Sequence, residues 1–160
     1  MNIQDRRDAI CRDMPAQGID LLIGFHDNGH FIEKPNAVML LAGFKSLGPT
    51  AIVLHRDGEC GLIVSPAWDA ERAAERVPGA IGSDDLAAAL GKYVERYKLP
   101  PARIGVAGLA GMPWQTESAI KTALKGEPRA MDAMVLHHTR RKTRDEIARA
   151  QGHRYRGKGL

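Results

Sequence analysis

The densest run of chemically capable side chains is His26-Asp-Asn-Gly-His30, which directly follows a short apolar segment. In open α/β sheets, ligands gather at the carboxyl ends of strands, so a site would form here. Two histidines four residues apart, with Asp27 between them, could bind a metal ion if the segment were helical. The Asn-Gly pair favours a turn instead. Three interpretations stay open: a solvated loop, which we favour, a surface that contacts substrate, and a metal site.

A second candidate is the glycine-rich stretch Gly105-Val-Ala-Gly108-Leu-Ala-Gly111, between a predicted strand and a predicted helix. Its spacing differs from GxGxxG, and no Lys-Ser or Lys-Thr follows, so a phosphate-binding loop is disfavoured. Small residues that let a strand turn tightly into Pro113 are the better account.

Nucleophilic chemistry has little support in the chain. There is no GxSxG elbow, Cys11 falls in an amphipathic helix, and Cys60 falls in a predicted strand, where cysteine is usually a core residue. The two cysteines form neither a disulfide framework nor a zinc spacing, so we expect a reducing cytoplasm. Trp68 and Trp114 are expected to be packing residues rather than a binding cage.

Composition bounds the class of protein. The 160 residues are 44% hydrophobic and 26% charged, which is typical of one soluble globular domain and excludes wholesale disorder. No apolar run approaches the ~20 residues of a membrane-spanning helix. The first residues, MNIQDRRDAI, are polar and charged, so no secretory signal is visible.

The net charge of +4 is distributed unevenly. Residues 137–160 hold eight basic and two acidic residues, a net +6, which leaves −2 on residues 1–136. His137 and His138 adjoin this basic stretch at a helix end, where a cation suits the helix dipole. With only Tyr155 interleaved, a solvated linker is favoured over a phosphate-binding tail. We expect neither nucleic acid nor membrane as a partner.

Apolar spacing and turn residues predict the elements that position these side chains. Strands are expected at 19–25, 50–55, 60–65, 80–82 and 103–107, and helices at 2–14, 35–41, 83–98, 113–125 and 131–138. A further helix is expected to open at Ser65-Pro66, with serine as the cap and proline at the first position. Asp57-Gly58, between two of the strands, is a strong hairpin signal.

This order of elements predicts an α/β fold. Strands alternate with helices, and one hairpin interrupts the alternation, so the sheet must be mixed. We expect a three-layer domain with a mixed β-sheet of about five or six strands and helices on both faces.

Several segments, in order along the chain, resemble the N-terminal domain of the creatinase, prolidase and aminopeptidase P family, the pita-bread metalloenzymes. The matching stretches are MPAQGIDLLI at 14–23, NAVMLLAGF at 36–44, TAIVLHRDGECGLIV at 50–64, the residues at 85–90, RIGVAG at 103–108 and DAMVLHHTRRKTRDEIARA at 132–150. The segment at 26–35 is longer than usual, and the tyrosine expected near position 39 or 40 is absent.

The resemblance implies a domain that is not itself catalytic. In this family two divalent metal ions lie in a C-terminal catalytic domain, on two aspartates, one histidine and two glutamates, and no residue here matches those ligands. The chain then has no catalytic residue, metal ligand or cofactor of its own. The resemblance implies a homodimer that closes over a partner's active site, with His26, Asp27 and His30 as its substrate-contacting edge.

The expected division is a domain at 1–141 followed by the start of a linker helix and a basic tail at 142–160. Thr143-Arg-Asp-Glu146 has the spacing of a capping box for that helix. After Gln151 the chain reads GHRYRGKGL, with three glycines that no helix favours. We hypothesise a shift of reading frame just after Gln151.

Three functions remain open at this point. The first is the N-terminal domain of a metal-dependent Xaa-Pro peptidase or creatinase-like hydrolase, separated from its catalytic domain. The second is a stand-alone peptide- or protein-binding module, a role that the family domain has in a histone chaperone subunit. The third, ranked lowest, is a small hydrolase with an unrecognised site.

Overall fold

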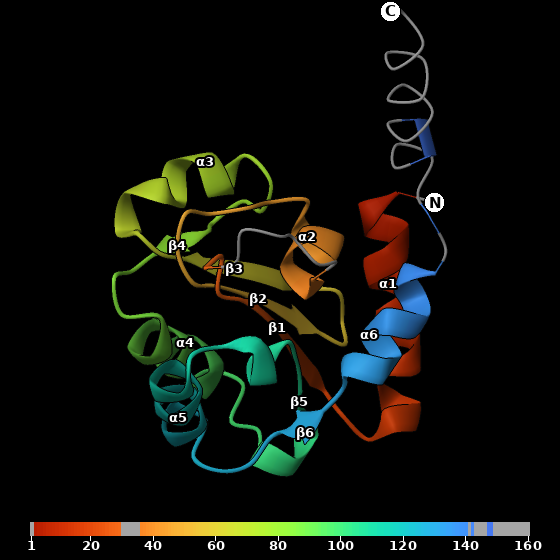
Figure 1. The fold of residues 1–160 in the computed structure, drawn as a ribbon. Helices are drawn as coiled ribbons and strands as arrows, with labels where there is room; N and C mark the ends of the chain where they lie inside the picture. Colours follow the sequence, from red (N-terminus) through yellow and green to blue (C-terminus); the bar gives the residue numbers. More distant parts are fainter. Residues whose placement is uncertain (1, 30–35, 141, 143–146, 149–160) are drawn as a thin grey trace, which may run out of the picture.

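The computed structural model describes residues 2–29, 36–140, 142 and 147–148. Those residues form one six-stranded sheet in the order β4-β3-β2-β1-β5-β6 (Figure 1). Only β2 runs antiparallel to its neighbours, β1 and β3, and the other pairs are parallel. The strands are β1 (Leu21–His26), β2 (Thr50–His55), β3 (Cys60–Val64), β4 (Ile81–Gly82), β5 (Ile104–Ala107) and β6 (Arg129–Ala130).

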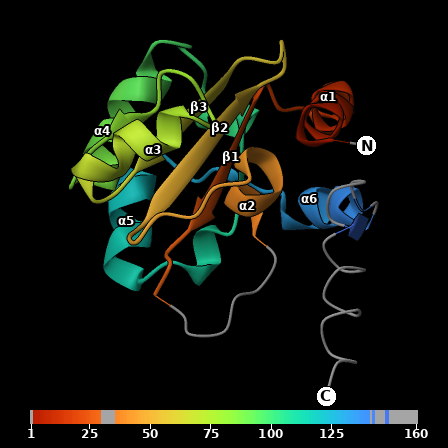
Figure 2. The same ribbon diagram turned by 90° about the horizontal axis from the view of Figure 1, so that it is seen from above.

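Helices cover both faces of this sheet. They are α1 (Ile3–Asp13), α2 (Ala37–Ala42), α3 (Ala70–Ala74), α4 (Leu86–Glu95), α5 (Trp114–Ala123) and α6 (Asp132–Thr139). Four short 3₁₀ turns are η1 (Pro15–Gln17), η2 (Ala67–Asp69), η3 (Pro101–Arg103) and η4 (Leu109–Gly111). Figure 2 shows α4 and α5 on one side of the sheet and α1, α2 and α6 on the other. The expected three-layer α/β architecture is confirmed.

The core is divided by the sheet into two halves. Alternate residues of a strand point to opposite faces, so Leu22 packs with α1 and α2 while Leu21 and Ile23 pack with α4 and α5. All three side chains are fully buried. Because both faces are covered, the strands are nearly continuous apolar runs rather than alternating ones.

Local signals in the sequence explain several boundaries. Asn2 caps α1, and Asp5 returns a bond to the Asn2 backbone, which completes a capping box. The predicted hairpin is β2–β3, and Gly58 turns it at φ +93°. Asn36 caps α2, and Gly43 ends it in the left-handed region at φ +61°, close to the end of the helix predicted at 35–41.

Two predicted helix starts are wrong. Pro66 is extended, with φ −70° and ψ 161°, and the Ala67 N–H donates to Asp84 Oδ1 at 2.9 Å, so Ser65 caps no helix. A 3₁₀ turn, η2, comes first, and α3 follows it. Likewise Asp85, rather than Ser83, caps α4, since its Oδ1 accepts the Ala88 N–H at 2.9 Å. At Ala67 an aspartate, Asp84, thus fills the role predicted for Ser65.

Strand β6 was not predicted. Its two residues, Arg129 and Ala130, are exposed, so no apolar pattern marks them, and only pairing with β5 makes them a strand. The capping box at 143–146, the boundary at residue 141 and the frame hypothesis after Gln151 lie outside the described residues. Within the described part of the chain, no helix has the length and apolar character to cross a membrane.

Candidate functional site at the carboxyl edge of the sheet

The parallel strands β1, β3, β4, β5 and β6 all end at one edge of the sheet, and β2 begins there. In open α/β sheets this edge is where ligands bind. Three of the segments at this edge are joined by hydrogen bonds: the turn after β1 at residues 26–29, the loop before β2 at residues 45–49, and the segment after β3 at residues 65–69. Their side chains define the candidate site.

The turn after β1 is tied to the loop before β2 through Asn28. Its Nδ2 donates to the Gly48 carbonyl oxygen at 2.6 Å and lies 3.4 Å from Thr50 Oγ1. Asn28 adopts the left-handed region at φ 57°, which asparagine tolerates better than most residues. Because Nδ2 is the donor, Oδ1 is an acceptor, and it receives a hydrogen bond from His26 Nδ1.

This bond determines which nitrogen of the His26 ring carries the hydrogen atom. With the proton on Nδ1, the neutral imidazole keeps its lone pair on Nε2. His26 is half-buried, and Asp27 Oδ1 accepts the Gly29 N–H at 3.2 Å in a tight turn. His26 and Asp27 are therefore neighbours at the predicted edge, while His30 lies outside the described residues. The turn predicted from Asn28-Gly29 is confirmed.

The loop at 45–49 is held firmly against the segment after β3. Gly48 N–H donates to the Ser65 carbonyl oxygen at 2.9 Å, and Ser65 N–H donates to the Pro49 oxygen at 3.1 Å. A Cβ on Gly48 would lie 2.7 Å from the Ser65 oxygen, so this approach requires glycine. The Ser46 hydroxyl lies 2.6 Å from Asp69 Oδ2 and 2.8 Å from the Ser65 oxygen.

Asp69 is the buried centre of this arrangement, with 1% of its surface exposed. Arg72 donates to both of its carboxylate oxygens at 2.8 Å and to the Lys45 carbonyl oxygen at 2.8 Å. The Arg72 guanidinium also lies 4.6 Å from the centre of the Phe44 ring. Hydrogen bonding from Arg72, aided by Ser46, lowers the pKa of Asp69 against the opposing effect of burial.

A carboxylate held in this way is a poor general base. Ser46 faces that carboxylate rather than an imidazole, so the pair lacks the base that would activate a serine nucleophile. The network of Ser46, Asp69 and Arg72 is instead suited to fixing a loop. It was not predicted, because Ser46 lies 23 residues before Asp69 in the sequence and the three residues carry no motif.

Three large apolar side chains are exposed to solvent, and one of them belongs to the fixed loop. Leu47, which follows Ser46, is 71% exposed, and Trp68, which precedes Asp69, is 69% exposed. Trp114, at the start of α5, is 77% exposed. The expectation that both tryptophans are packing residues is wrong. The buried residue of η2 is Asp69, and that of α5 is Ile120, so both tryptophans remain outside.

The other sequence candidates have structural roles. Gly108 lies at φ +79°, and its N–H donates to Asp132 Oδ1 at 2.8 Å, so a carboxylate occupies the place that a phosphate would take. The tight-turn interpretation is confirmed there.

Burial raises the pKa of the Cys11 and Cys60 thiols, which suits core residues rather than nucleophiles. His138 Nε2 lies 2.8 Å from Asp13 Oδ2 and links α6 to α1.

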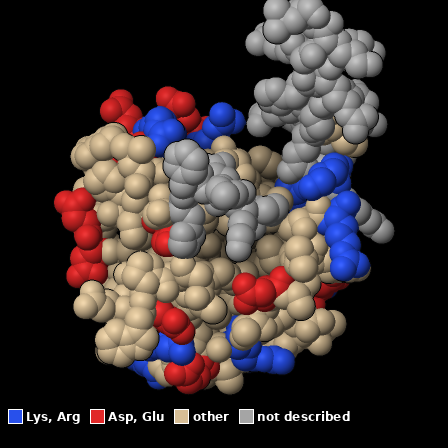
Figure 3. Space-filling view, viewed as in Figure 1, with Lys and Arg blue, Asp and Glu red and all other residues tan. Residues whose placement is uncertain are grey.

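Among the described residues, neither charge nor metal-binding side chains indicate a second site. On the face shown in Figure 3, basic and acidic side chains are interspersed over the described residues. Among those same residues, no group of three or more His, Cys, Asp and Glu side chains is placed to hold a metal ion.

Comparison with known proteins shows which solved structures have a similar fold. No family model matches the chain, and no curated protein matches it. Among solved structures, it is similar to the Xaa-Pro dipeptidase from Bacillus anthracis, with TM-score 0.70, 15% identity and 92% of this chain covered. The chain spans only 38% of that protein's length.

Two further structures match over nearly their whole length. The N-terminal domain of the cytoplasmic peptidase PepQ from Mycobacterium tuberculosis H37Rv has TM-score 0.63 and 17% identity, with 84% of this chain and 98% of that one covered. The creatinase/prolidase-like N-terminal domain of a metallopeptidase from Corynebacterium diphtheriae has TM-score 0.58 and 17% identity, with 81% and 94% covered. The chain thus has the fold of creatinase/prolidase-like N-terminal domains, as the sequence resemblance implied.

Proposed function

We propose that this chain is the non-catalytic N-terminal domain of a metal-dependent Xaa-Pro peptidase or creatinase-like hydrolase. The observation that carries the proposal is the fold, which matches solved N-terminal domains of such peptidases over 94% and 98% of their length and over 81% and 84% of this chain. The domain dimerises and shapes the substrate pocket of a partner, and we expect it to act in the cytoplasm. Two divalent metal ions, held by the separate catalytic domain, would supply the activated water for hydrolysis.

The carboxyl edge is the part of the domain suited to meet that pocket. The loop at 45–49 is fixed by hydrogen bonds on both sides, so its exposed Leu47 loses little conformational freedom on contact. His26 and Asp27 lie beside this loop and offer an imidazole nitrogen and a carboxylate to the polar ends of a peptide. The edge thus combines an apolar anchor with polar groups, as binding sites for small peptides require.

A stand-alone binding module is the second candidate. It is favoured by the two apolar cores, which are both closed by this chain's own helices within the described residues. A domain with complete cores can fold without a catalytic partner. The exposed Leu47 and Trp68 would then receive a peptide or a protein rather than the rim of an active site.

The first test is to read the coding DNA beyond the Leu160 codon in all three frames. The proposal predicts an open frame for a domain with the two-aspartate, one-histidine, two-glutamate metal set. If no frame encodes such a domain, the peptidase proposal fails and the binding module replaces it.

The second test uses the catalytic domain encoded there, loaded with metal. Leu47→Asp should weaken its association with the present chain by roughly tenfold or more, since a buried apolar anchor is lost. Ala16→Asp is the matched control, because this exposed residue lies in η1 at the opposite edge of the sheet. Equal affinities for the two variants would remove Leu47 from the interface.

A further inference from the structure

The two cysteines have no part in the proposed function, and the fold brings them to one place. Cys11 lies near the end of α1, and Cys60 is the first residue of β3. Both are free thiols. The Cys11 thiol donates to the His55 carbonyl oxygen, with Sγ and the oxygen 3.4 Å apart. One thiol thus lies against the end of the β2–β3 hairpin, and the other belongs to that hairpin.

The register of the two strands places Cys60 next to this contact. Cys60 pairs with Leu54 of β2. His55 follows Leu54, and its N–H donates to the Glu59 oxygen at 2.8 Å. Side chains directly opposite each other in an antiparallel pair share one face. Leu54 and Cys11 pack in the same half of the core, and Cys60 packs against that half. Both thiols therefore lie between α1 and the hairpin.

Arg7 adds a positive charge beside the pair. It lies four residues before Cys11, and therefore on the same face of α1. Its Nε donates to the Leu41 carbonyl oxygen at 2.6 Å, which holds the side chain in place. Burial raises the pKa of the Cys60 thiol, Arg7 opposes that rise, and the Cys11 thiol adds to it. Electrostatic effects weaken with distance, which agrees with the placement of Arg7 and Cys11 near Cys60.

We propose that Cys11 and Cys60 form a reversible disulfide by exchange with a small-molecule disulfide such as oxidised glutathione. Cys60 is half-buried and Cys11 is only 9% exposed, so Cys60 reacts first. The Cys60 thiol loses its proton, and the thiolate attacks one glutathione sulfur. A mixed disulfide forms, and the other glutathione leaves as a thiolate that takes up a proton.

The second step closes the bond within the chain. The Cys11 thiol loses its proton, its thiolate attacks the Cys60 sulfur, and the remaining glutathione leaves and is protonated in turn. Two protein thiols are oxidised, and one glutathione disulfide is reduced to two thiols. The new bond ties α1 to the hairpin and restricts the unfolded chain between residues 11 and 60, which makes the oxidised domain more resistant to unfolding. The redox state of the surroundings thereby controls the stability of the domain.

Equilibration of the full chain in a buffer of reduced and oxidised glutathione, without and with urea, tests the proposal. Burial slows exchange, so equilibrium is approached from the reduced and from the oxidised chain, and peptide mass spectrometry measures the internal disulfide. The equilibrium constant for its formation should be roughly tenfold or more higher in the folded chain than in urea, because the fold holds the two thiols together. By reciprocity, oxidation then raises the folding equilibrium constant by the same factor. An equal or lower constant in the folded chain would refute the proposal.

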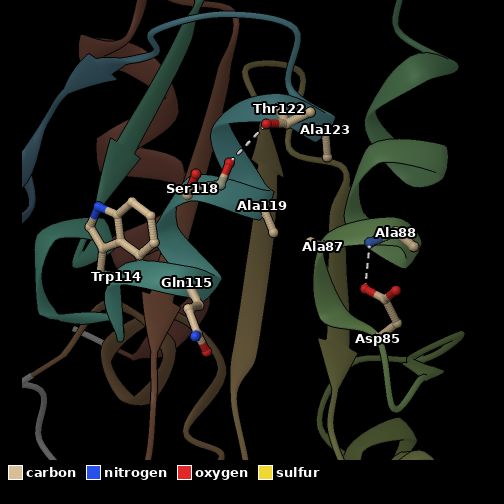
Figure 4. Close-up of a pocket in the computed structure, with 9 residues that line it drawn as sticks. All are labelled: Asp85, Ala87, Ala88, Trp114, Gln115, Ser118, Ala119, Thr122 and Ala123. Atoms are coloured by element: carbon tan, nitrogen blue, oxygen red, sulfur yellow. Dashed lines mark hydrogen bonds between the residues drawn. The ribbon is translucent and has the colours of Figure 1, made fainter.

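Two variants separate the effect of the fold from the number of thiols. Cys11→Ala should stop after the first step and keep one glutathione on Cys60. Adding Ser118→Cys to that variant restores two thiols on opposite faces of the sheet. Ser118 is exposed on α5, beside a groove of about 520 Å³ between α4 and α5 (Figure 4).

The double variant should form no more internal disulfide when folded than in urea. A gain equal to that of wild type would show that proximity of Cys11 and Cys60 is not the cause. Folded wild type that carries a glutathione on each cysteine, with no internal bond, would equally overturn the proposal.

Discussion

Removal of the Ser46 hydroxyl tests how the loop at 45–49 is held. Ser46→Ala deletes one hydrogen bond to a buried carboxylate, that of Asp69, at 2.6 Å. Such a bond to a charged group contributes about 1.5 to 3 kcal/mol. Asp69 keeps both bonds from Arg72, so it is not left without a partner, and the lower end of that range applies. We expect the free energy of unfolding to fall by about 1.5 to 2 kcal/mol.

Urea unfolding followed by circular dichroism measures this change as a lower midpoint with an unchanged slope. Ser118→Ala is the control, since Ser118 is exposed on α5, and its effect should stay within about 0.5 kcal/mol. The cost of Ser46→Ala should also shrink by about 1 kcal/mol in an Asp69→Asn background, where the acceptor is uncharged. An equal cost in both backgrounds would refute the assigned hydrogen bond.

Acidification provides a further check on the same bond. Arg72 and Ser46 lower the pKa of folded Asp69, so this carboxylate stabilises the fold above the unfolded pKa of about 3.9. That contribution is lost only as the pH falls through the lower, folded pKa. The cost of Ser46→Ala should therefore be constant from pH 7 to about 4.5 and diminish only at more acidic pH. A cost that already declines near pH 6 would contradict a depressed pKa.

Three other predictions follow from particular contacts. Gly108→Ala should lower stability by about 2 kcal/mol or more in thermal melts, because φ is +79° and the new Cβ would lie 2.5 Å from a backbone oxygen of β1. Asp20, whose pKa is lowered chiefly by a hydrogen bond from Arg103, should stabilise the fold above pH about 3.9, so Asp20→Asn should cost about 1 to 2 kcal/mol at pH 7 and little at pH 2. Cys11 and Cys60, with pKa values raised by burial, should react slowly with thiol reagents at pH 7 and rapidly after unfolding in urea.

The sequence was sufficient where structure depends on neighbouring residues. Backbone and capping preferences that act over three or four residues explain three features of the fold. These are the Asp57-Gly58 turn, the end of α2 at Gly43 and the cap of α1 at Asn2. The apolar runs of β1 and β2 predicted buried strands, because such segments have no stable place outside a covered sheet. These features were enough for the layer architecture.

The candidate site depended on contacts between distant segments. His26 and Asp27 could be named in advance from their place after a strand, but Ser46 and Asp69 could not, because only the loop at 45–49 brings the two together. The predicted cap at Ser65 failed for the same reason, since Asp84 reaches the helix start from 17 residues away.

Strand β6 and the two exposed tryptophans also show where local sequence is not enough and tertiary contacts decide the structure. Local sequence determined which segments are apolar enough to be buried, since burial free energy follows from the residue types. The tertiary structure alone decided which apolar residues stay outside, because that depends on how many inward positions the neighbouring elements leave. Trp114 is therefore predicted from the sequence to be a packing residue, whereas its side chain is exposed to solvent in the structure.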